Sequence, residues 1–308
     1  MILAPLPFLT VTVEAQRDRP EIHIHPGGQG VWAARMASLL GARVELCAAL
    51  GGESGRLLGP LLDHSGVALR AVELESAANA AFVHDRREGE RHPIAEEPEP
   101  RPTRHEIDSL YTAALASGLA ADAALLTGTV DLSIINGGFY RRLVHDLNAG
   151  GTVVVADLIG EQLRGALLSG VHVIKIAAKR LVQDGYAPGS TPQELMEGVN
   201  ALHDAGAQNV VVSRGASPAV GLIEDQPIEA AGPSFEVVDS HGTGDSQSAG
   251  MTVALACGNS MRDAVKLGVA AGALNVTRRG LGSGDRQAIE EHAGRIEIRP
   301  WQPPSRNG

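Results

Sequence analysis

The chain has few aromatic residues, only two cysteines and no excess of basic charge. Aromatics make up 3% of the 308 residues, so alanine, valine, leucine and glycine must fill the core. Cys47 and Cys257 lie in apolar surroundings and read as reduced core residues, which excludes a disulfide framework or a cysteine-rich zinc site. The formal net charge of −10 argues against nucleic acid as the main partner, but it allows a locally positive anion site.

Long apolar runs are also missing. No run approaches the roughly 18 residues of a membrane-spanning helix, so we expect no membrane partner. Segment 1–9 is apolar but has no basic region or cleavage site, so we interpret it as a first strand and not as a signal peptide. We therefore expect a cytoplasmic protein, long enough for one large α/β domain with an ample core.

Strand and helix signals alternate through most of the chain. Short and nearly unbroken apolar runs are typical of strands buried on both faces; they occupy 44–50, 123–126, 153–156, 171–174 and 210–212. Helical patterns separate them at 31–40, 106–119, 135–148 and 192–205. This rhythm predicts an α/β fold with a doubly wound, mostly parallel sheet.

Two segments depart from that rhythm. Residues 10–25 and 79–96 alternate apolar and polar side chains, which is typical of half-exposed antiparallel strands. We expect them to form a small β-sheet lid over residues 10–26 and 77–100. The α/β core would then comprise residues 1–9, 27–76 and 101–308, with a frayed tail at 300–308.

The most informative stretch runs from Asp239 to Ser246, with glycines at 242 and 244 and a small-residue helix at 247–258. Segment 235–238 before it reads as a strand. A strand, a glycine turn and a helix N-terminus together make an anion cradle from free backbone N–H groups. Asp245 at its rim would repel a simple anion, but it suits a base that deprotonates a hydroxyl attacking a phosphoryl group. The alternative is an ordinary helix start with Asp in its first turn.

A second glycine cluster, Gly27, Gly28 and Gly30, opens a small-residue helix at 31–37. By itself it is more simply interpreted as a tight strand-to-helix turn. No P-loop with its lysine is present, and no Gly-x-Gly-x-x-Gly follows the first strand.

Taken together, the two clusters resemble the two signatures of the ribokinase (PfkB) family of carbohydrate kinases. The first matches a Gly-Gly-x-Gly helix start, and the second matches Asp-x-x-Gly-x-Gly-Asp at 239–245. The start at 6–13 and the Gly-Asp-Ser at 244–246 resemble most the phosphofructokinase and tagatose-phosphate kinase group. The family likeness runs from end to end of the chain.

The resemblance implies roles for individual residues. Asp245 would be the catalytic base, and the amides of Gly242, Thr243 and Gly244 would form the anion hole. ATP would be the donor and Mg²⁺ would accompany it, with no metal held by protein ligands alone. The lid would also pair two subunits into a homodimer. The nucleotide site would involve Lys175, Ser213, Gly215 and Asn275, and the substrate site Thr10, Gly27, Gly28, Gln29, Trp32, Arg86 and Arg87.

The departures from the family pattern concentrate on the acceptor side. Leu6 and Thr10 stand where relatives carry sugar-binding Asn and Asp, Trp32 replaces an Asn, and Gln29 replaces a Lys. Fewer hydroxyl partners predict a less hydroxylated or more apolar acceptor than an ordinary hexose phosphate.

Three further groups leave alternatives open. Near Lys175, Ala177 and Arg180 replace an expected Asn and Glu, and Arg180 either neutralises phosphate charge or lies on a solvated helix face. Arg86 and Arg87 either clamp an anionic substrate group or form a solvated hairpin tip. The pair at positions 23 and 25, both histidine, faces one side of a strand, where metal binding would need a third ligand, so solvated or interface histidines are the simpler reading.

We therefore predict an ATP-dependent kinase that phosphorylates a hydroxyl of a small sugar, sugar phosphate or related polyol. The alternative is a catalytically weak ligand-binding or regulatory protein on the same fold. Retention of Asp245 favours the kinase, since a pure binding module has no use for a base beside an anion hole.

Overall fold

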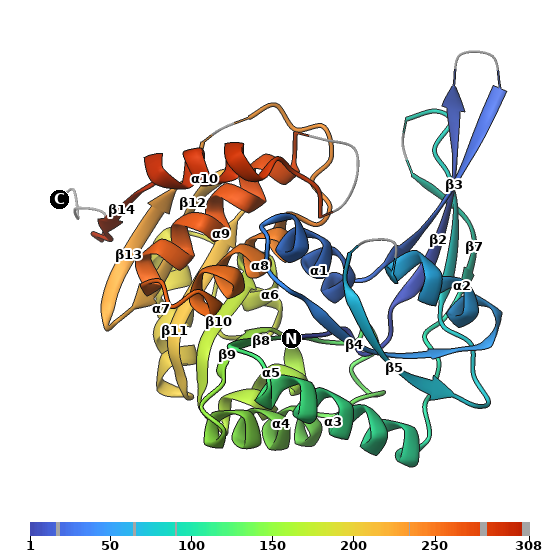
Figure 1. Cartoon of the computed structure of the whole chain (residues 1–308). Coiled ribbons are helices and arrows are strands. Elements are labelled where there is room, and N and C mark those ends of the chain that lie inside the picture. The colour runs from blue at the N-terminus through green and yellow to red at the C-terminus, as the bar shows by residue number, and fades with distance from the viewer. Residues whose placement is uncertain (17–18, 64–65, 90, 234, 278–281, 304–308) are drawn as a thin grey trace.

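A computed structural model describes residues 1–16, 19–63, 66–89, 91–233, 235–277 and 282–303. It contains a ten-stranded main sheet flanked by helices and a separate four-stranded sheet that projects from one side (Figure 1). The main sheet has the order β14-β13-β12-β11-β10-β9-β8-β1-β4-β5. Its strands are β1 (Ile2–Leu3), β4 (Glu45–Gly51), β5 (Ala68–Leu74), β8 (Ala123–Thr127), β9 (Val153–Asp157), β10 (Val171–Ala177), β11 (Ala207–Arg214), β12 (Ser217–Ile223), β13 (Gln226–Ala231) and β14 (Glu297–Pro300).

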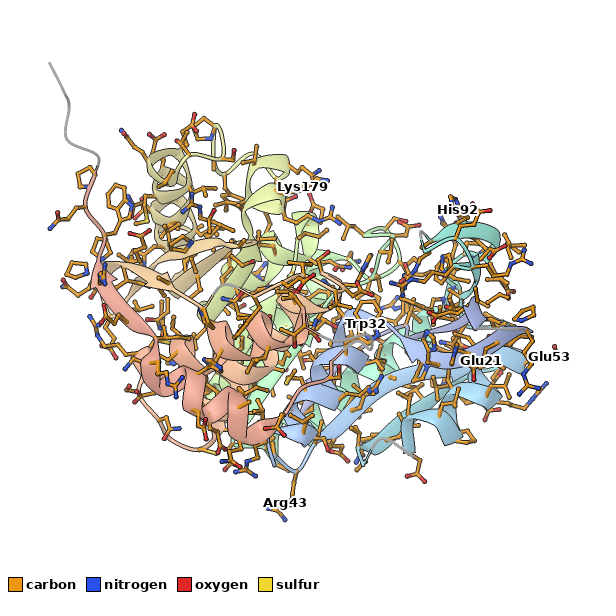
Figure 2. All side chains as sticks on the ribbon, turned by 90° about the horizontal axis from the view of Figure 1, so that it is seen from above. Glu21, Trp32, Arg43, Glu53, His92 and Lys179 are labelled. Atoms are coloured by element: carbon orange, nitrogen blue, oxygen red, sulfur yellow. The ribbon has the colours of Figure 1, made fainter. Side chains whose placement is uncertain are left out.

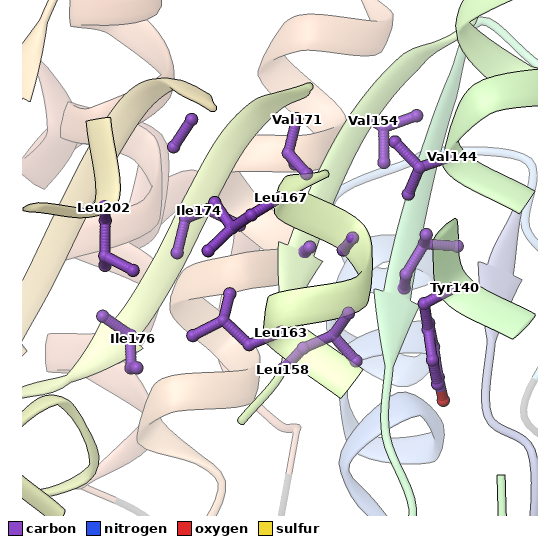
Figure 3. Packing of buried hydrophobic residues seen from close by; sticks show 14 of the residues in the cluster. Tyr140, Val144, Val154, Leu158, Leu163, Leu167, Val171, Ile174, Ile176 and Leu202 are labelled. Atoms are coloured by element: carbon purple, nitrogen blue, oxygen red, sulfur yellow. The ribbon is translucent and has the colours of Figure 1, made fainter. Parts of the chain in front are cut away.

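Helices cover both faces of this sheet. One hydrophobic core lies under α3 (Arg104–Leu119), α4 (Gly137–Ala149), α5 (Gly160–Leu167), α6 (Ala178–Gln183) and α7 (Pro192–Asp204). The other lies under α1 (Gln29–Leu39), α2 (Gly52–Asp63), α8 (Thr243–Ala256), α9 (Met261–Asn275) and α10 (Arg286–Arg295). Successive strand residues alternate between the two cores, as Leu125 and Leu126 do, which explains the unbroken apolar runs. Figure 3 shows the packing of the first core around Tyr140, Leu163 and Ile174.

The predicted doubly wound, mostly parallel sheet is confirmed. Pairing is parallel from β5 through β4, β1, β8, β9 and β10 to β11, and the added strands β12, β13 and β14 are antiparallel. The short β1 lies between β4 and β8, so the chain winds outward in both directions from it. Such a switch point leaves a crevice at the carboxyl ends of the strands, where α/β proteins bind ligands.

The second sheet, here called the lid, confirms the alternating pattern seen in the sequence, but its strands are not all antiparallel: β2–β3 and β6–β7 are antiparallel pairs, whereas β2 and β6 are parallel. Its order is β3-β2-β6-β7, built from β2 (Phe8–Gln16), β3 (Arg19–Gly27), β6 (Ala81–Asp85) and β7 (His92–Glu97). Thr10 and Thr12 on β2 are buried, whereas Ile22 and Ile24 on β3 are exposed by 64% and 50%. The lid therefore turns a polar face inward and an apolar face outward.

Two expected strands are wrong. Segment 235–238 is not in a strand, because the N–H groups of Val238 and Asp239 donate to the carbonyl of Val276 and not to a neighbouring strand. Segment 1–9 is not one strand either: β1 ends at Leu3, and by Phe8 the chain has already entered the lid. The expectation for the tail falls largely outside the described residues, which end at 303.

Within the described ranges, none of the helices combines the length and apolar character needed to cross a membrane.

Candidate active site

The N-terminus of α8 lies at the carboxyl ends of the parallel strands and is open to an anion. Gly242 is its N-cap, with a left-handed φ of 71° that favours glycine, and no side chain caps the first turn. The hydroxyl of Thr243 donates instead to the carbonyl of Ser240 at 2.7 Å. The first backbone N–H groups of the helix thus remain available, together with the positive end of its dipole.

Asp245 occupies the first turn of the same helix and is buried. Burial raises the pKa of this carboxyl to about 7, with a further contribution from the negative charge of Asp157, while Lys175 opposes both. A carboxyl group with a pKa near neutrality is suited to accept a proton from a hydroxyl under working conditions.

A buried ion pair supports the cradle from below. The ammonium of Lys175, on β10 and only 2% exposed, lies 3.0 Å from Oδ2 of Asp157 at the end of β9. The hydroxyl of Ser248 on α8 donates to the same oxygen at 2.7 Å. Two strands and a helix thereby fix the lysine beside the glycine turn.

Gly244 lies directly against the buried lysine. A Cβ built on Gly244 would lie 2.6 Å from Nζ of Lys175, so a side chain there would displace the ammonium. The left-handed residue of the turn is Gly242, not Gly244. The two glycines therefore serve different needs. Gly242 provides the left-handed backbone conformation, and Gly244 leaves room for the ammonium of Lys175.

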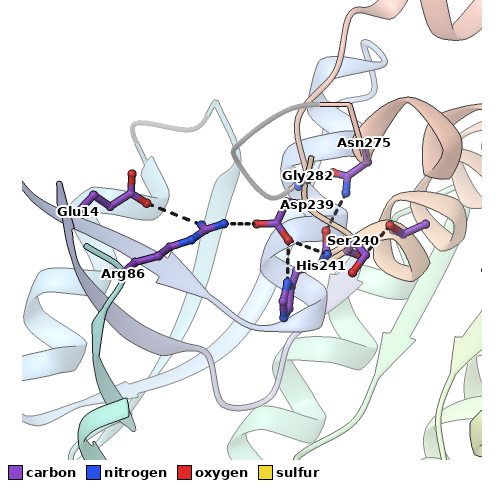
Figure 4. A network of polar contacts seen from close by, with 8 residues as sticks. Glu14, Arg86, Asp239, Ser240, His241, Asn275 and Gly282 are labelled. Carbon is purple, nitrogen blue, oxygen red and sulfur yellow. Dashed lines mark hydrogen bonds and ion pairs between the residues drawn. The ribbon is translucent and has the colours of Figure 1, made fainter. Parts of the chain in front are cut away.

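A polar network ties the glycine turn to the lid (Figure 4). The carboxylate of Asp239 accepts from the backbone N–H of His241 at 3.0 Å and lies 2.7 Å from its Nδ1. Arg86 of the loop after β6 lies 3.5 Å from Asp239 and 3.7 Å from Glu14 on β2. Burial alone would raise the pKa of Asp239, but these hydrogen bonds and charges hold it below its usual value.

A cavity of about 310 Å³ separates the inner face of the lid from the core. Trp32 on α1 lies at this junction in Figure 2 and lines the cavity. The other lining residues are mostly charged or titratable: Thr12, Glu14, His23, His25, Pro26, Arg35, Arg86, Arg91 and Asp239. A larger hollow of about 650 Å³ lies between α3 and α4, but no residue of the glycine turn lines it.

The other residues expected to bind substrate surround the cavity without all lining it. Thr10 is buried on the inner face of the lid, and Gly27 packs so tightly under Phe8 that a Cβ would lie 2.2 Å from the ring. Gly28 is the N-cap of α1 with a φ of 120°, and Gln29 begins that helix with an exposed side chain.

The two arginines of the loop between β6 and β7 have different surroundings. Arg86 lines the cavity but is held between Glu14 and Asp239, whereas Arg87 is 55% exposed, pairs with Asp85 and does not line it. Leu6, expected near the acceptor, packs instead with Ala49 in a small hydrophobic cluster.

The residues expected at the nucleotide site have mixed placements. Ser213 is the penultimate residue of β11 and pairs with Ala177, and Gly215 follows the strand in an exposed left-handed turn with φ 62°, so both lie at the carboxyl edge of the sheet. Asn275 is 1% exposed, and its amide donates to the carbonyl of His241 and accepts from the N–H of Gly282. It therefore braces the glycine turn from α9 with one amide N–H and the amide oxygen. Arg180 is exposed and pairs with Gln183, as on a solvated helix face.

Sequence reasoning missed Asp157, Ser248, Arg35 and Arg91. Asp157 could have been found, because it directly follows the predicted strand 153–156 and strand ends meet at one edge of a parallel sheet. Arg35 lies one helical turn after Trp32 and so shares its face. Arg91 offered no signal, since only the lid geometry brings it to the cavity. Three lining arginines favour a charged acceptor over the apolar one that the sequence led us to expect.

Replacing Asp157 by Asn should shift the pH dependence of the reaction. Loss of its negative charge lowers the pKa of Asp245 from about 7, so the acid limb of kcat/KM should move to lower pH. Asp204→Asn, on an exposed site at the end of α7, is the matched control and should leave the profile in place. An unmoved limb in the Asp157 variant would show that the limb does not report Asp245.

An uncapped helix N-terminus, a buried carboxyl with a raised pKa and a lid over the carboxyl edge of a parallel sheet define a phosphotransferase that activates an acceptor hydroxyl. The chain matches the model of the pfkB family carbohydrate kinases over residues 8–288, and so belongs to that family. The resemblance inferred from the two glycine signatures is confirmed.

Individual relatives agree with this assignment. An ATP-dependent 6-phosphofructokinase isozyme 2 of Mycobacterium tuberculosis is 28% identical over 92% of this chain and 86% of its own length. A 1-phosphofructokinase of Haloferax volcanii is 28% identical over 79% of this chain and 77% of its own. The fold is shared with a possible 1-phosphofructokinase of Thermotoga maritima, at 18% identity, a TM-score of 0.83 and coverage of 98% and 99%. It is also shared with Escherichia coli phosphofructokinase-2 solved with fructose-6-phosphate, at 22%, 0.78, and 96% and 97%.

Proposed function

We propose that this carbohydrate kinase transfers the γ-phosphoryl group of ATP to a hydroxyl of a sugar phosphate. The observation that carries the proposal is Asp245, buried in the first turn of an uncapped helix with its pKa raised to about 7. The names of the relatives support both ATP as donor and a sugar phosphate as acceptor. Use of ATP also keeps the cytoplasm as our expectation for its location.

In this mechanism the acceptor lies in the cavity under the lid, with its reacting hydroxyl toward Asp245. The carboxylate takes the hydroxyl proton as the oxygen attacks the γ-phosphorus. The amides of Gly242, Thr243 and Gly244 and the ammonium of Lys175 stabilise the charge on the transferring group. The nucleotide lies along the carboxyl edge of the sheet, past Ser213 and Gly215.

Mg²⁺ would enter with the nucleotide. Among the described residues, no three His, Cys, Asp or Glu side chains cluster as a metal site, and Asp157 is already engaged by Lys175 and Ser248. The residues fit a cation held by phosphate oxygens and water, which Mg²⁺ prefers. Bound there, it would neutralise phosphate charge.

The test is ADP release, coupled to a recording enzyme, with a panel of acceptors. The panel should contain fructose 6-phosphate, fructose 1-phosphate, tagatose 6-phosphate and their unphosphorylated sugars, each with Mg²⁺ and with Mn²⁺. Acceptor-dependent ADP release that the Asp245→Asn variant lacks supports the kinase. ATP and sugar-phosphate binding without any acceptor-dependent release would favour the weakly catalytic binding protein.

We also propose that the lid pairs two copies of the chain. Its outward face is apolar: Ile22 and Ile24 face away from the cavity beside Val11 and Val13 in the register of β2 and β3. An apolar patch of two exposed isoleucines beside two half-buried valines is typical of an interface. Ile24→Lys should convert a dimer to a monomer in sedimentation velocity, whereas Leu168→Lys, at an even more exposed position between α5 and β10, should not. A monomeric parent protein would contradict the proposal.

A further inference from the structure

Among the residues that the structure describes, three arginines line the cavity under the lid, but only two carboxylates do, Glu14 and Asp239. Arg86 is matched by Glu14 and Asp239, but Arg35 and Arg91 have no acidic partner among the residues the structure describes. Arg35 is half-buried, and loss of hydration lowers the pKa of its guanidinium. Partly buried cations without partners are costly, and a bound anion would remove that cost.

His25 lies on the wall of the same cavity, close to these two arginines. It is half-buried on β3, and it makes no hydrogen bond or ion pair within the described part of the chain. The groups that act on its imidazole are Arg35 from α1, Arg91 from the segment before β7, His23 from β3 and Glu14 from β2. Three of these four repel a proton on the ring, so a protonated His25 is disfavoured while the cavity is empty.

Thr12 adds an independent sign that a polar ligand belongs here. It is 2% exposed and lines the cavity, yet its hydroxyl oxygen has no hydrogen-bond partner among the described residues. His84, opposite Thr12 in the register of β2 and β6, also has an unpartnered buried ring nitrogen, Nδ1. Buried polar groups are normally satisfied, so these groups indicate a missing partner on the inner face of the lid.

We propose that His25 is a specificity-determining residue of the acceptor site: it takes up a proton when the phosphate group of the acceptor enters, and the imidazolium then holds that dianion together with Arg35 and Arg91. The inference rests on the proposed function, because it assigns the non-reacting phosphate of a sugar phosphate to this wall. Burial, followed by Arg35, Arg91 and His23, lowers the pKa of His25 in the empty cavity. A dianion among the same groups reverses the sign of the local field and raises that pKa, so binding becomes tighter as pH falls.

The direct test is calorimetric titration of the wild-type protein with fructose 6-phosphate and fructose 1-phosphate at pH 7.5. Two buffers of different ionisation enthalpy give the number of protons taken up. The second pKa of a phosphomonoester is about 6, so the ligand is already a dianion and can only release protons on binding to cations. Any net uptake of protons must therefore be by a group of the protein, and we expect it to be a substantial fraction of one proton.

Two variants assign the uptake to one residue. His25→Gln should abolish the uptake and raise KM for the sugar phosphate by about tenfold at pH 6.5, with a smaller effect at pH 8 and kcat changed less than KM. His25→Lys, a permanent cation, should bind without uptake and with a KM that no longer improves as pH falls. His172→Gln, at a half-buried histidine on β10 that does not line the cavity, is the control and should behave as the parent.

The outcomes separate this inference from the function beneath it. A protein that phosphorylates a sugar phosphate but binds it with no proton uptake, or with uptake that His25→Gln leaves in place, overturns the inference and leaves the kinase standing. A protein that neither binds nor phosphorylates either sugar phosphate overturns the proposed acceptor class, and the role of His25 with it.

Discussion

Asp245→Asn should lower kcat by about two to four orders of magnitude, the usual contribution of a general base. Asn has nearly the same shape and can occupy the first turn of α8, but it cannot take the proton of the acceptor hydroxyl. Sugar-phosphate and ATP binding should change little, because the anion hole is made by backbone N–H groups. Steady-state kinetics with the best acceptor of the panel measure the effect, and turnover within threefold of the parent would remove Asp245 from the reaction.

The same variant should be more stable than the parent above neutral pH. The folded pKa of Asp245 is raised from 3.8 to about 7, so its stabilising contribution is present below about pH 4 and lost as pH rises through 7. Above pH 7 the folded parent must hold a buried carboxylate, at a cost of up to about 4 kcal/mol. Asn carries no charge and avoids that cost.

Urea unfolding at pH 8 and pH 5 measures the difference. The free energy of unfolding of Asp245→Asn should exceed that of the parent, and the difference should be larger at pH 8 than at pH 5. Asp204→Asn should show no such trend. A catalytic loss together with a pH-dependent gain in stability is the signature of a site that stores strain for its chemistry. The same difference in stability between variant and parent at both pH values would show that the carboxylate of Asp245 is solvated.

Lys175→Met should remove activity and stability together. The ammonium stabilises charge beside the glycine turn, so kcat should fall by about two to three orders of magnitude. The substitution also leaves Asp157 buried without its cation, which costs roughly 3–5 kcal/mol. The rate of ADP release and the free energy of unfolding should therefore both fall.

The double variant Lys175→Met with Asp157→Asn separates the two effects. It removes both charges of the buried pair, so most of the lost stability should return, while activity should not. Recovery of activity along with stability would mean that Lys175 acts only by holding the fold. Failure of the double variant to regain stability would mean that the pair is not the source of the loss.

Much of the architecture was readable from local patterns. The runs at 153–156 and 210–212 are apolar at every position because both faces of those strands are covered, and the alternation at 10–25 follows from a sheet with one polar and one apolar face. The strand predicted at 235–238 was wrong because a short valine-rich run carries no information about its hydrogen-bond partner. Here that partner is a single carbonyl at the end of α9.

The sequence by itself determined the family, the glycine turn and Asp245, since these depend on residue types at fixed spacing along one continuous stretch. It also determined the lid, through a period of two that no buried strand shows. The tertiary structure decided what surrounds them. Asp157, Lys175 and Ser248 come from three separate elements. A side chain at position 244 would collide with Lys175 only because β10 ends beside the first turn of α8. Arg35, Arg91 and His25 meet only where the lid closes over α1, because charge balance in a cavity depends on distances through space that sequence spacing does not encode.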